Sequence, residues 1–398
     1  MDVCLIILPS PFLIDERVFP PLGLMAVGTA LKLKGHDVTI YDGDIDKVPL
    51  NFSYYGFGPT TPEYPYALAI KNRIKQHNPK AKVIIGGPHA TLNTSCLNDG
   101  FDCVVSGDGE NVVEQAFLKD APMIIAPERP LDEYPIIDRT ILDLKKYQYY
   151  LNGRLATTLM TSQGCPFKCG FCAKNYRSVR FRSVESVLKE IDMLHFDFGY
   201  DALAFPEDLF ILDKQRTERI CGYLKGLDII WRCLIRADIA VKHGQAFIKT
   251  LADSGCVSVG MGVESGSDKI LSTIHKGETV ETIKTAIRML KGEGIRVKGF
   301  FILGLPGETE ETLAETNLFL AEMNLDDVDI KIYQPFPGTP IWHNKDAYDI
   351  QWQEIELGKA FYKGRPREYY GNVRTSALTN RQIYDSWVEM EAKYKNVC

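Results

Sequence analysis

The chain has 398 residues, too many for one ordinary hydrophobic core, so its length favours two or three domains. With 45% hydrophobic and 25% charged residues, the composition is that of a globular protein and excludes a disordered or low-complexity chain. The net charge of −6 disfavours a nucleic-acid partner but does not exclude one, because a local basic groove could still bind nucleic acid.

The beginning of the chain and its cysteines indicate the compartment. No apolar run reaches the roughly 18 residues of a membrane helix, and the first residues lack the basic start and cleavage site of a signal peptide. Ten cysteines without a secretion signal favour a reducing compartment, which we expect to be the cytoplasm.

Residues 1–128 alternate short apolar runs with helical patterns. We predict strands over Val3–Leu8, Val38–Tyr41, Tyr54–Phe57, Lys82–Ile85 and Cys103–Val105, and helices over Leu22–Lys34 and Tyr66–Gln76. Such alternation is typical of a parallel, doubly wound α/β sheet of the Rossmann-like kind. The stretch from Tyr41 to Tyr54 is too short and Pro-interrupted for a helical crossover, so one helix is expected to be missing there.

Glycines and turn residues follow these strands at 9–11, 58–61, 86–91 and 107–110. Ligands of such sheets bind at the carboxyl ends of the strands, where these loops lie. None of the loops matches GxGxxG or a P-loop, so neither a dinucleotide nor an NTP is indicated. His89 lies in the loop over 86–91. A lone histidine is more often a hydrogen-bonded structural residue than a ligand, and we expect it to pack against whatever fills the crevice.

A linker over 129–155 separates this domain from a second alternation over 156–340. Its predicted strands are Thr157–Met160, Ala202–Phe205, Ile229–Ile235, Val257–Val263, Val297–Leu303 and Val328–Tyr333. Its predicted helices are Val184–Leu194, Asp213–Lys225, Gln245–Ala252, Thr279–Lys291 and Glu310–Met323. Residues 341–398 are polar and tyrosine-rich, and we expect a small cap that contains a helix over Asn380–Tyr394.

Three cysteines, Cys165, Cys169 and Cys172, follow the first strand of the second alternation with CxxxCxxC spacing. Three thiolates on one short loop can hold three corners of an iron–sulfur cluster, whose usual complement is four thiolates, so one iron would be open. The alternative is a structural zinc site. Zinc prefers four ligands, usually in two pairs, and the sequence has no second pair nearby.

The run Gly164–Cys172, with the aromatic Phe171 before its last cysteine, resembles the signature of the radical S-adenosylmethionine (SAM) enzymes. The six strand–helix repeats resemble the partial (β/α)6 barrel of that family. The resemblance implies a [4Fe-4S] cluster whose open iron chelates SAM, and SAM cleavage to a 5′-deoxyadenosyl radical that removes hydrogen from an unactivated carbon.

Polar residues at the strand ends are the candidate SAM ligands, since such ends converge on the active face of a barrel. Glu207 and Asp208 would meet the SAM amino group, Arg236 its carboxylate and Glu264 the ribose hydroxyls, while Gly304, like Gly299, would let the adenine approach the backbone. The alternatives are a turn cap for Glu207 or Asp208, a structural ion pair for Arg236 and a helix N-cap for Glu264.

The first domain resembles the cobalamin-binding domain that precedes the barrel in one large radical SAM class. The resemblance rests on the PPLG, GGPHAT and GDGE segments at 20–23, 86–91 and 107–110, and the DxHxxG motif of other cobalamin proteins is absent. It implies cobalamin contacts from Thr60, Gly86, Gly87, Pro88, His89, Ala90, Thr91, Gly107 and Glu110.

The leading hypothesis is a cobalamin-dependent C-methyltransferase. One alternative is a radical SAM rearrangement, cyclisation or other non-methylating modification of a small metabolite, nucleobase or polymer side chain, with a degenerate cobalamin domain. Another is a non-catalytic cluster or SAM-binding module, which would not need the strand-end charges. Tyr333 and Gln334 are candidate substrate contacts. The basic run Lys174, Arg177, Arg180 and Arg182 is either a solvated face or a contact for an anionic substrate or a flavodoxin- or ferredoxin-type reductant.

Overall fold

A computed structural model describes residues 1–398 except 12, 14, 174, 177, 354–370 and 395–398. The chain divides into two compact units. Met1–Gln148 make up most of the first, and Tyr149–Cys172 with Ser178–Ile355 make up most of the second. Among the described helices, none is long and apolar enough to cross a membrane.

The first unit is built on a sheet of six parallel strands in the order β2-β1-β3-β4-β5-β6. The strands are β1 (Asp2–Ile6), β2 (Asp37–Tyr41), β3 (Tyr54–Phe57), β4 (Lys82–Ile85), β5 (Cys103–Ser106) and β6 (Met123–Ile125). Strand order reverses between β1 and β3, and open sheets of this kind bind ligands beside such a switch point, at the carboxyl ends of the strands.

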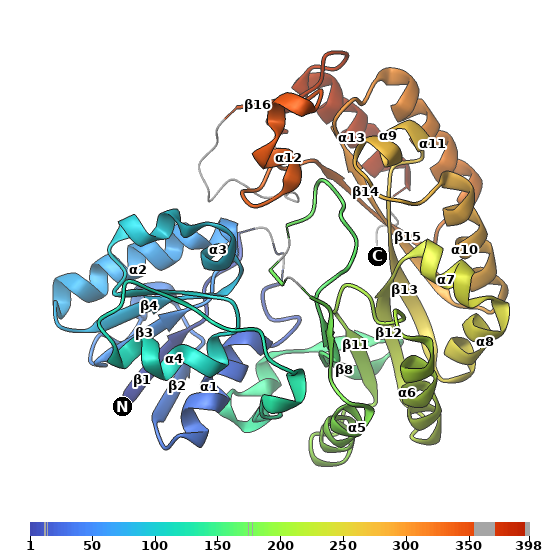
Figure 1. Ribbon diagram of the computed structural model, residues 1–398. Helices are drawn as coiled ribbons and strands as arrows, with labels where there is room; N and C mark the ends of the chain where they lie inside the picture. Colours follow the sequence, from blue (N-terminus) through green and yellow to red (C-terminus); the bar gives the residue numbers. More distant parts are fainter. Residues whose placement is uncertain (12, 14, 174, 177, 354–370, 395–398) are drawn as a thin grey trace. The chain divides into compact units, whose positions relative to one another are not determined.

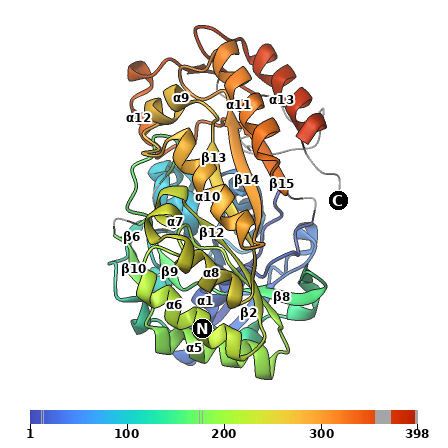
Figure 2. The same ribbon diagram turned by 90° about the vertical axis from the view of Figure 1, so that its right-hand side faces the viewer.

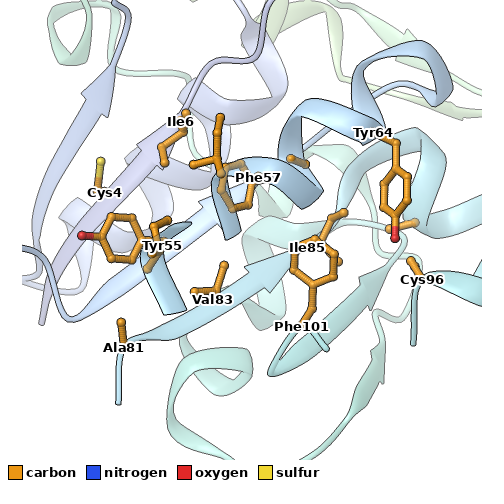
Figure 3. Close-up of a cluster of buried hydrophobic side chains, with 14 of the residues drawn as sticks. Cys4, Ile6, Tyr55, Phe57, Tyr64, Ala81, Val83, Ile85, Cys96 and Phe101 are labelled. Atoms are coloured by element: carbon orange, nitrogen blue, oxygen red, sulfur yellow. The ribbon is translucent and has the colours of Figure 1, made fainter. Parts of the chain in front are cut away.

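Helices cover both faces of this sheet (Figure 1). One face packs on α2 (Tyr64–His77) and α3 (Gly87–Leu92), and the other on α1 (Leu22–Leu33) and α4 (Gly109–Leu118). Figure 3 shows the first of these cores, where alternate residues of β1, β3 and β4 meet aromatic side chains from the loops and helices. The doubly wound α/β arrangement is therefore confirmed, while α4 and β6 were not predicted.

The GGPHAT segment differs from its prediction as a loop, because α3 begins there at Gly87. Gly87 has φ +77°, and a Cβ there would lie 2.9 Å from the backbone of Gly58, so glycine is needed for this turn. Pro88 follows at the first helical turn, where a missing N–H is harmless. The predicted loss of a crossover helix is confirmed, since only the 3₁₀ turn Ile45–Lys47 lies between β2 and β3.

The second unit contains a seven-stranded sheet in the order β15-β14-β13-β12-β11-β8-β7. The six parallel strands are β8 (Arg154–Thr158), β11 (Ala202–Phe205), β12 (Ile230–Ile235), β13 (Cys256–Glu264), β14 (Arg296–Leu303) and β15 (Asp327–Ile332). β15 and β8 do not pair, so the sheet curls without closing, which confirms the partial barrel. The antiparallel edge strand β7 (Tyr149–Leu151) and the start of β8 lie inside the segment interpreted as a linker.

Helices line the outer face of this sheet (Figures 1 and 2). They are α5 (Val184–Asp192), α6 (Lys214–Gly226), α8 (Gln245–Asp253), α10 (Val280–Gly292) and α11 (Glu310–Met323). The short helices α7 (Ala237–His243) and α9 (Asp268–Thr273) follow the ends of β12 and β13 and were not predicted. The described part of the C-terminal segment contains α12 (Pro340–His343), the paired strands β16 (Gln351–Trp352) and β17 (Val373–Arg374), and α13 (Asn380–Tyr394).

Candidate active site

The cysteine loop is held at its base by a two-stranded ribbon. Antiparallel strands β9 (Ser162–Gln163) and β10 (Arg180–Phe181) close the loop, and Arg180 donates to the side chain of Gln163 at 2.6 Å. Gly164 begins the loop with φ +88°, and a Cβ there would lie 2.3 Å from the carbonyl oxygen of Ser178. The loop can therefore leave β9 in this direction only with glycine at this position.

Backbone hydrogen bonds fix the middle of the loop. Gly170 donates to the carbonyl of Ile274 at 2.7 Å and accepts from the amide of Ile341 at 3.0 Å. The amide of Cys172 donates to the carbonyl of Cys169 at 3.2 Å. The loop is thus anchored both to the turn after α9 and to the start of α12.

The three thiols lie near one another. Cys172 keeps an exposed face, but enough protein surrounds its sulfur to raise its pKa to about 12, and the charges of Asp208, Cys169, Cys165 and Glu264 act in the same direction. In the described part of the chain, no three His, Cys, Asp or Glu side chains converge closely enough to hold one metal ion.

This spacing bears on the choice between zinc and a cluster. Thiolates around one tetrahedral zinc, with Zn–S of about 2.3 Å, stand roughly 3.8 Å apart. In a cubane cluster each thiolate binds a different iron, so the sulfurs stand farther apart. The two alternatives thus differ in the sulfur spacing that they require, and three cysteines without a second pair nearby in the sequence favour the cluster.

The two carboxylates after β11 have different surroundings. Glu207 is buried and accepts a hydrogen bond from the hydroxyl of Thr161, whereas Asp208 is exposed and lies close enough to Cys172 to influence its pKa. Burial raises the pKa of Glu207 to about 7 against the effect of that hydrogen bond. Of the two predicted ligands, Asp208 is the one that faces the cysteine loop with an accessible carboxylate.

Arg236 follows β12 and is almost fully buried, with only 6% of its side chain exposed. Its guanidinium forms a fork with Asp238, with Nε–Oδ1 at 3.0 Å and Nη2–Oδ2 at 3.2 Å. Nη2 also donates to the carbonyl of Lys276 at 2.8 Å, and Nη1 donates to the sulfur of Cys169 at 3.8 Å. Burial acts to lower its pKa, but Asp238 and Glu278 outweigh it, so the pKa is raised and the group is firmly cationic.

Glu264 ends β13 in the left-handed backbone region, with φ +66°, at an irregularity in the pairing of β13 with β14. A residue other than glycine is rarely held there, and such conformations cluster at functional sites. The carboxylate folds back over Gly262, where a Cβ would lie 2.3 Å from Oε1. The N-cap alternative is not observed, because Ser267 precedes α9.

Lys276 and Glu278 belong to the same site but were missed in the sequence. The Nζ of Lys276 lies 3.2 Å from Oε1 of Glu264 and 3.4 Å from Oε2 of Glu278. Burial acts to lower the pKa of Lys276, but the two carboxylates reverse the effect and raise it. The other oxygen of Glu278 accepts from the amide of Asp238 at 2.9 Å. Charged residues in a turn between helices are typical of exposed turns, so the sequence carried no signal for them.

Gly304 ends β14 and is covered by the C-terminal segment. Its φ is +77°, and the space for a side chain is taken by Val373 and Ile383 at 2.9 and 3.2 Å. Its amide donates to Glu308, a fully buried carboxyl. Burial raises the pKa of Glu308 to about 8, opposed by hydrogen bonds from the amides of Gly304 and Leu305. The adenine contact of Gly304 stays a prediction, as does any contact of the partly buried Phe171.

Tyr333 and Gln334 follow β15 and are both buried. Their substrate contacts stay predictions. In the basic run, Arg180 pairs with Gln163, and Arg182 forms a partly buried ion pair with Glu190 at 2.5 Å. A role of the run as a contact for an anionic substrate or a reductant stays a prediction. Lys174 and Arg177 lie outside the described residues.

The candidate cobalamin residues lie together at the carboxyl edge of the first sheet. Thr60 precedes α2, residues 86–91 follow β4, and Gly107 and Glu110 follow β5. Hydrogen bonds tie these loops into one rim: the amide of His89 donates to the carbonyl of Pro59 at 3.1 Å, and the amide of Gly107 donates to the hydroxyl of Thr91 at 3.1 Å. The rim fits a ligand bound across neighbouring strands.

His89 is buried rather than presented at this rim, with 1% of the residue exposed. Its ring stacks on Tyr64, with centroids 4.2 Å apart, and Nδ1 lies 3.2 Å from the hydroxyl of Thr61. Figure 3 shows Tyr64 at one end of the buried cluster. Burial lowers the pKa of His89 to about 4, so the ring is neutral. The expectation of a packing residue agrees with this environment, and ligation of a metal would require the ring to leave the core.

Two family patterns match the chain. The radical SAM superfamily matches residues 159–320, which span most of the half-barrel, and the B12 binding domain matches residues 16–117 in the first unit.

Two curated relatives extend over both units. An uncharacterised methyltransferase of Pyrococcus horikoshii is 30% identical over 392 residues, with 88% of this chain and 84% of the relative covered. The anaerobic magnesium-protoporphyrin IX monomethyl ester cyclase of Rubrivivax gelatinosus is 30% identical over 302 residues, covering 67% of this chain and 54% of the relative.

Among solved structures, the cobalamin-dependent SAM radical enzyme OxsB, with aqua-cobalamin and SAM bound, is similar with a TM-score of 0.75. The match covers 98% of this chain and 67% of OxsB at 18% sequence identity, so it concerns the fold.

Replacing Gly164 should weaken cluster binding. Gly164→Ala places a Cβ against the Ser178 carbonyl and must displace the start of the loop, so we expect the iron and sulfide content after anaerobic reconstitution to fall at least severalfold. Gly199→Ala is the matched control, because Gly199 also has a positive φ, of +73°, but no atom within 4 Å of the added Cβ. Equal iron in both variants would contradict this account of the loop.

His89→Ala should leave bound cobalamin unchanged while weakening the fold. Loss of the buried stack on Tyr64 should lower the free energy of unfolding by about 2–3 kcal/mol. The paramagnetic resonance spectrum of the cobalt(II) form should keep its nitrogen splitting pattern, because His89 is buried and is not expected to be the ligand. His77→Ala, at the exposed end of α2, serves as the control for stability. A changed spectrum would mean that the ring leaves the core to bind cobalt.

Glu308 should make stability depend on pH. Its raised pKa means that the folded chain keeps a proton that the unfolded chain has lost, so stability falls as pH rises from about 4.5 to about 8 and is then level. The side chain of Glu308→Gln cannot ionise. This variant should therefore lack the pH-dependent fall in the free energy of unfolding, which is on the order of a few kcal/mol in the wild type. Thermal midpoints of the cluster-free protein at pH 5, 6.5 and 8 measure this, and identical slopes in both proteins would refute it.

Proposed function

Since the chain belongs to the radical SAM superfamily and carries a B12 binding domain ahead of its half-barrel, we propose that it is a cobalamin-dependent methyltransferase of an unactivated carbon. The observation that carries the proposal is the rim of the first unit, whose strand-end loops remain tied together as a ligand site requires. The Pyrococcus horikoshii relative, a methyltransferase that matches over both units, supports it.

When bound, the [4Fe-4S] cluster and SAM supply a radical that removes hydrogen from the substrate, and cobalamin supplies the methyl group. Cys165, Cys169 and Cys172 would hold three corners of the cluster. Glu264, fixed by Lys276, would accept from the ribose hydroxyls, and Asp208 would accept from the ammonium group. The loop anchors at Gly170 would keep the thiolates in register with these carboxylates.

The first unit would bind cobalamin at its strand-end rim. Thr60, the 86–91 segment, Gly107 and Glu110 would line the ligand from three neighbouring loops. His89 would support the rim from below through its stack on Tyr64. Tyr333 and Gln334, at the end of the last barrel strand, would contact the substrate.

The superfamily needs a reductant, and we propose a flavodoxin- or ferredoxin-type protein as the donor. A reducing compartment such as the cytoplasm suits both the cluster and the nine cysteines that the structure describes, which are all free thiols.

A second candidate is a non-methylating reaction such as ring closure. The Rubrivivax gelatinosus relative is a cyclase, and the first unit has only a 3₁₀ turn between β2 and β3. A domain of that kind could shape a substrate cleft without binding cobalamin.

One experiment separates the two candidates. The protein is reconstituted anaerobically with iron, sulfide and hydroxocobalamin, desalted, assayed for metals and incubated with SAM and a strong reductant. The methyltransferase proposal expects about four irons and about one cobalt per chain, with both 5′-deoxyadenosine and S-adenosylhomocysteine formed. The matched control, Cys169→Ala, should lose 5′-deoxyadenosine but keep its cobalt.

The other outcomes each exclude a candidate. 5′-Deoxyadenosine without cobalt and without S-adenosylhomocysteine would overturn methylation and favour the non-methylating reaction. Absence of 5′-deoxyadenosine from a protein with full iron would overturn both.

A further inference from the structure

Arg236 lies against the cysteine loop rather than facing an open pocket. Its Cζ is 3.6 Å from the centroid of the Phe167 ring, and Nη1 donates to the sulfur of Cys169 at 3.8 Å. Cys169 is the middle cysteine of the three and is itself buried. The guanidinium therefore covers one side of the thiolate that would carry a corner of the cluster.

The geometry of Arg236 argues against its predicted pairing with the SAM carboxylate. A bidentate clamp uses two parallel N–H groups, and the Nε/Nη2 edge is already engaged by Asp238. Nη2 also serves the Lys276 carbonyl. A ligand carboxylate could take that edge only by displacing the Asp238 carboxylate, which is partly buried, from it.

Three groups fix the position of the Arg236 guanidinium. Asp238 in α7 forms an ion pair with it, Glu278 lies 3.5 Å from Nη2, and the Lys276 carbonyl accepts a hydrogen bond from Nη2. Glu278 also accepts from the amide of Asp238, so the two carboxylates are fixed relative to each other. The turn that carries Lys276 and Glu278 follows Ile274, whose carbonyl anchors Gly170 of the cysteine loop. The same turn thus positions both the guanidinium and the thiolate.

We propose that Arg236 is a positioning residue that raises the reduction potential of the cluster by donating a hydrogen bond and holding a positive charge at the Cys169 thiolate. This inference rests on the proposed function, since it concerns the cluster of that site. Reduction adds a negative charge to the cluster, and hydrogen bonds to its sulfurs together with nearby cations stabilise that charge. Asp238 and Glu278 moderate the effect because they partly neutralise the guanidinium.

The test is the reduction potential of the SAM-free protein, followed by the paramagnetic resonance signal of the reduced cluster. At the potential where the wild-type cluster is half reduced, Arg236→Gln should raise the ratio of oxidised to reduced cluster about tenfold, which corresponds to about 59 mV for one electron. Asp238→Asn should shift the ratio in the opposite direction, because it leaves the guanidinium less neutralised. This opposite sign is not expected from mere loosening of the loop.

Arg232→Gln is the matched control. Arg232 lies on β12, the strand that Arg236 follows, and its Nη1 donates to the hydroxyl of Tyr149 at 2.9 Å. Its replacement should leave the ratio within twofold of wild type. If Arg236→Gln fails to retain iron, Arg236→Lys and Asp238→Asn are measured instead. Arg236→Lys keeps the charge and should shift the ratio less than tenfold, while Asp238→Asn should still lower the ratio of oxidised to reduced cluster.

SAM affinity distinguishes this role from the predicted one. If Arg236 bound the SAM carboxylate, Arg236→Gln would weaken SAM binding tenfold or more and leave the SAM-free potential unchanged, and that result would overturn the proposal. An unchanged potential in variants with full iron would overturn it as well. Failure of the wild-type chain to assemble any cluster would instead overturn the proposed function.

Discussion

The buried ion-pair network around Lys276 is the interaction on which the site depends. Arg236 pairs with Asp238 and Glu278, and Lys276 pairs with Glu264 and Glu278, so Glu278 joins the two cations into one network. Removing one partner of such a network leaves a buried charge uncompensated, which typically destabilises a protein by about 3–5 kcal/mol. The five groups come from the residue that follows β12, from α7, from the end of β13 and from the turn before α10, so the network joins four separate segments. The carboxylate of Glu264 and the thiolate of Cys169 are therefore positioned by one set of contacts.

Local conformations at the site make sense only with this network in place. Glu264 is held at a positive φ, which costs on the order of 1–3 kcal/mol for a residue with a side chain. The ion pair with Lys276 and the absence of a side chain at Gly262 allow the carboxylate to fold back in this conformation. Gly164 begins the cysteine loop with a turn in which the Cβ of any other residue would clash with the Ser178 carbonyl.

Much of the fold was accessible from the sequence because it depends on local patterns. Alternating apolar runs predicted all six parallel strands of the barrel, and the spacing of the three cysteines predicted the loop that follows the first strand. The elements that were missed are short: α3 begins at a glycine and proline that are typical of turns, and α7 and α9 have six or seven residues. The prediction that Arg236 meets the SAM carboxylate was limited for another reason. Its partners Lys276 and Cys169 are 40 and 67 residues away in the chain, and no local pattern shows that a guanidinium at a strand end is already occupied. The burial of Glu308 has no local signal in the sequence either, because it depends on the packing of the strand end and the C-terminal segment around it.

The occupation of Arg236 leaves the question of what would balance the carboxylate of SAM. Lys276 is shared between Glu264 and Glu278, so neither buried cation of the network has an unused charge for it. A cluster held by three cysteines would, however, keep one iron without a protein ligand, and such an iron would be a Lewis acid for carboxylate and amine. Under the proposed function, Asp208 and Glu264 would accept from the ammonium and hydroxyl groups of SAM, and the open iron would supply a site for its carboxylate. The guanidinium of Arg236 would then act on the thiolate side of the cluster.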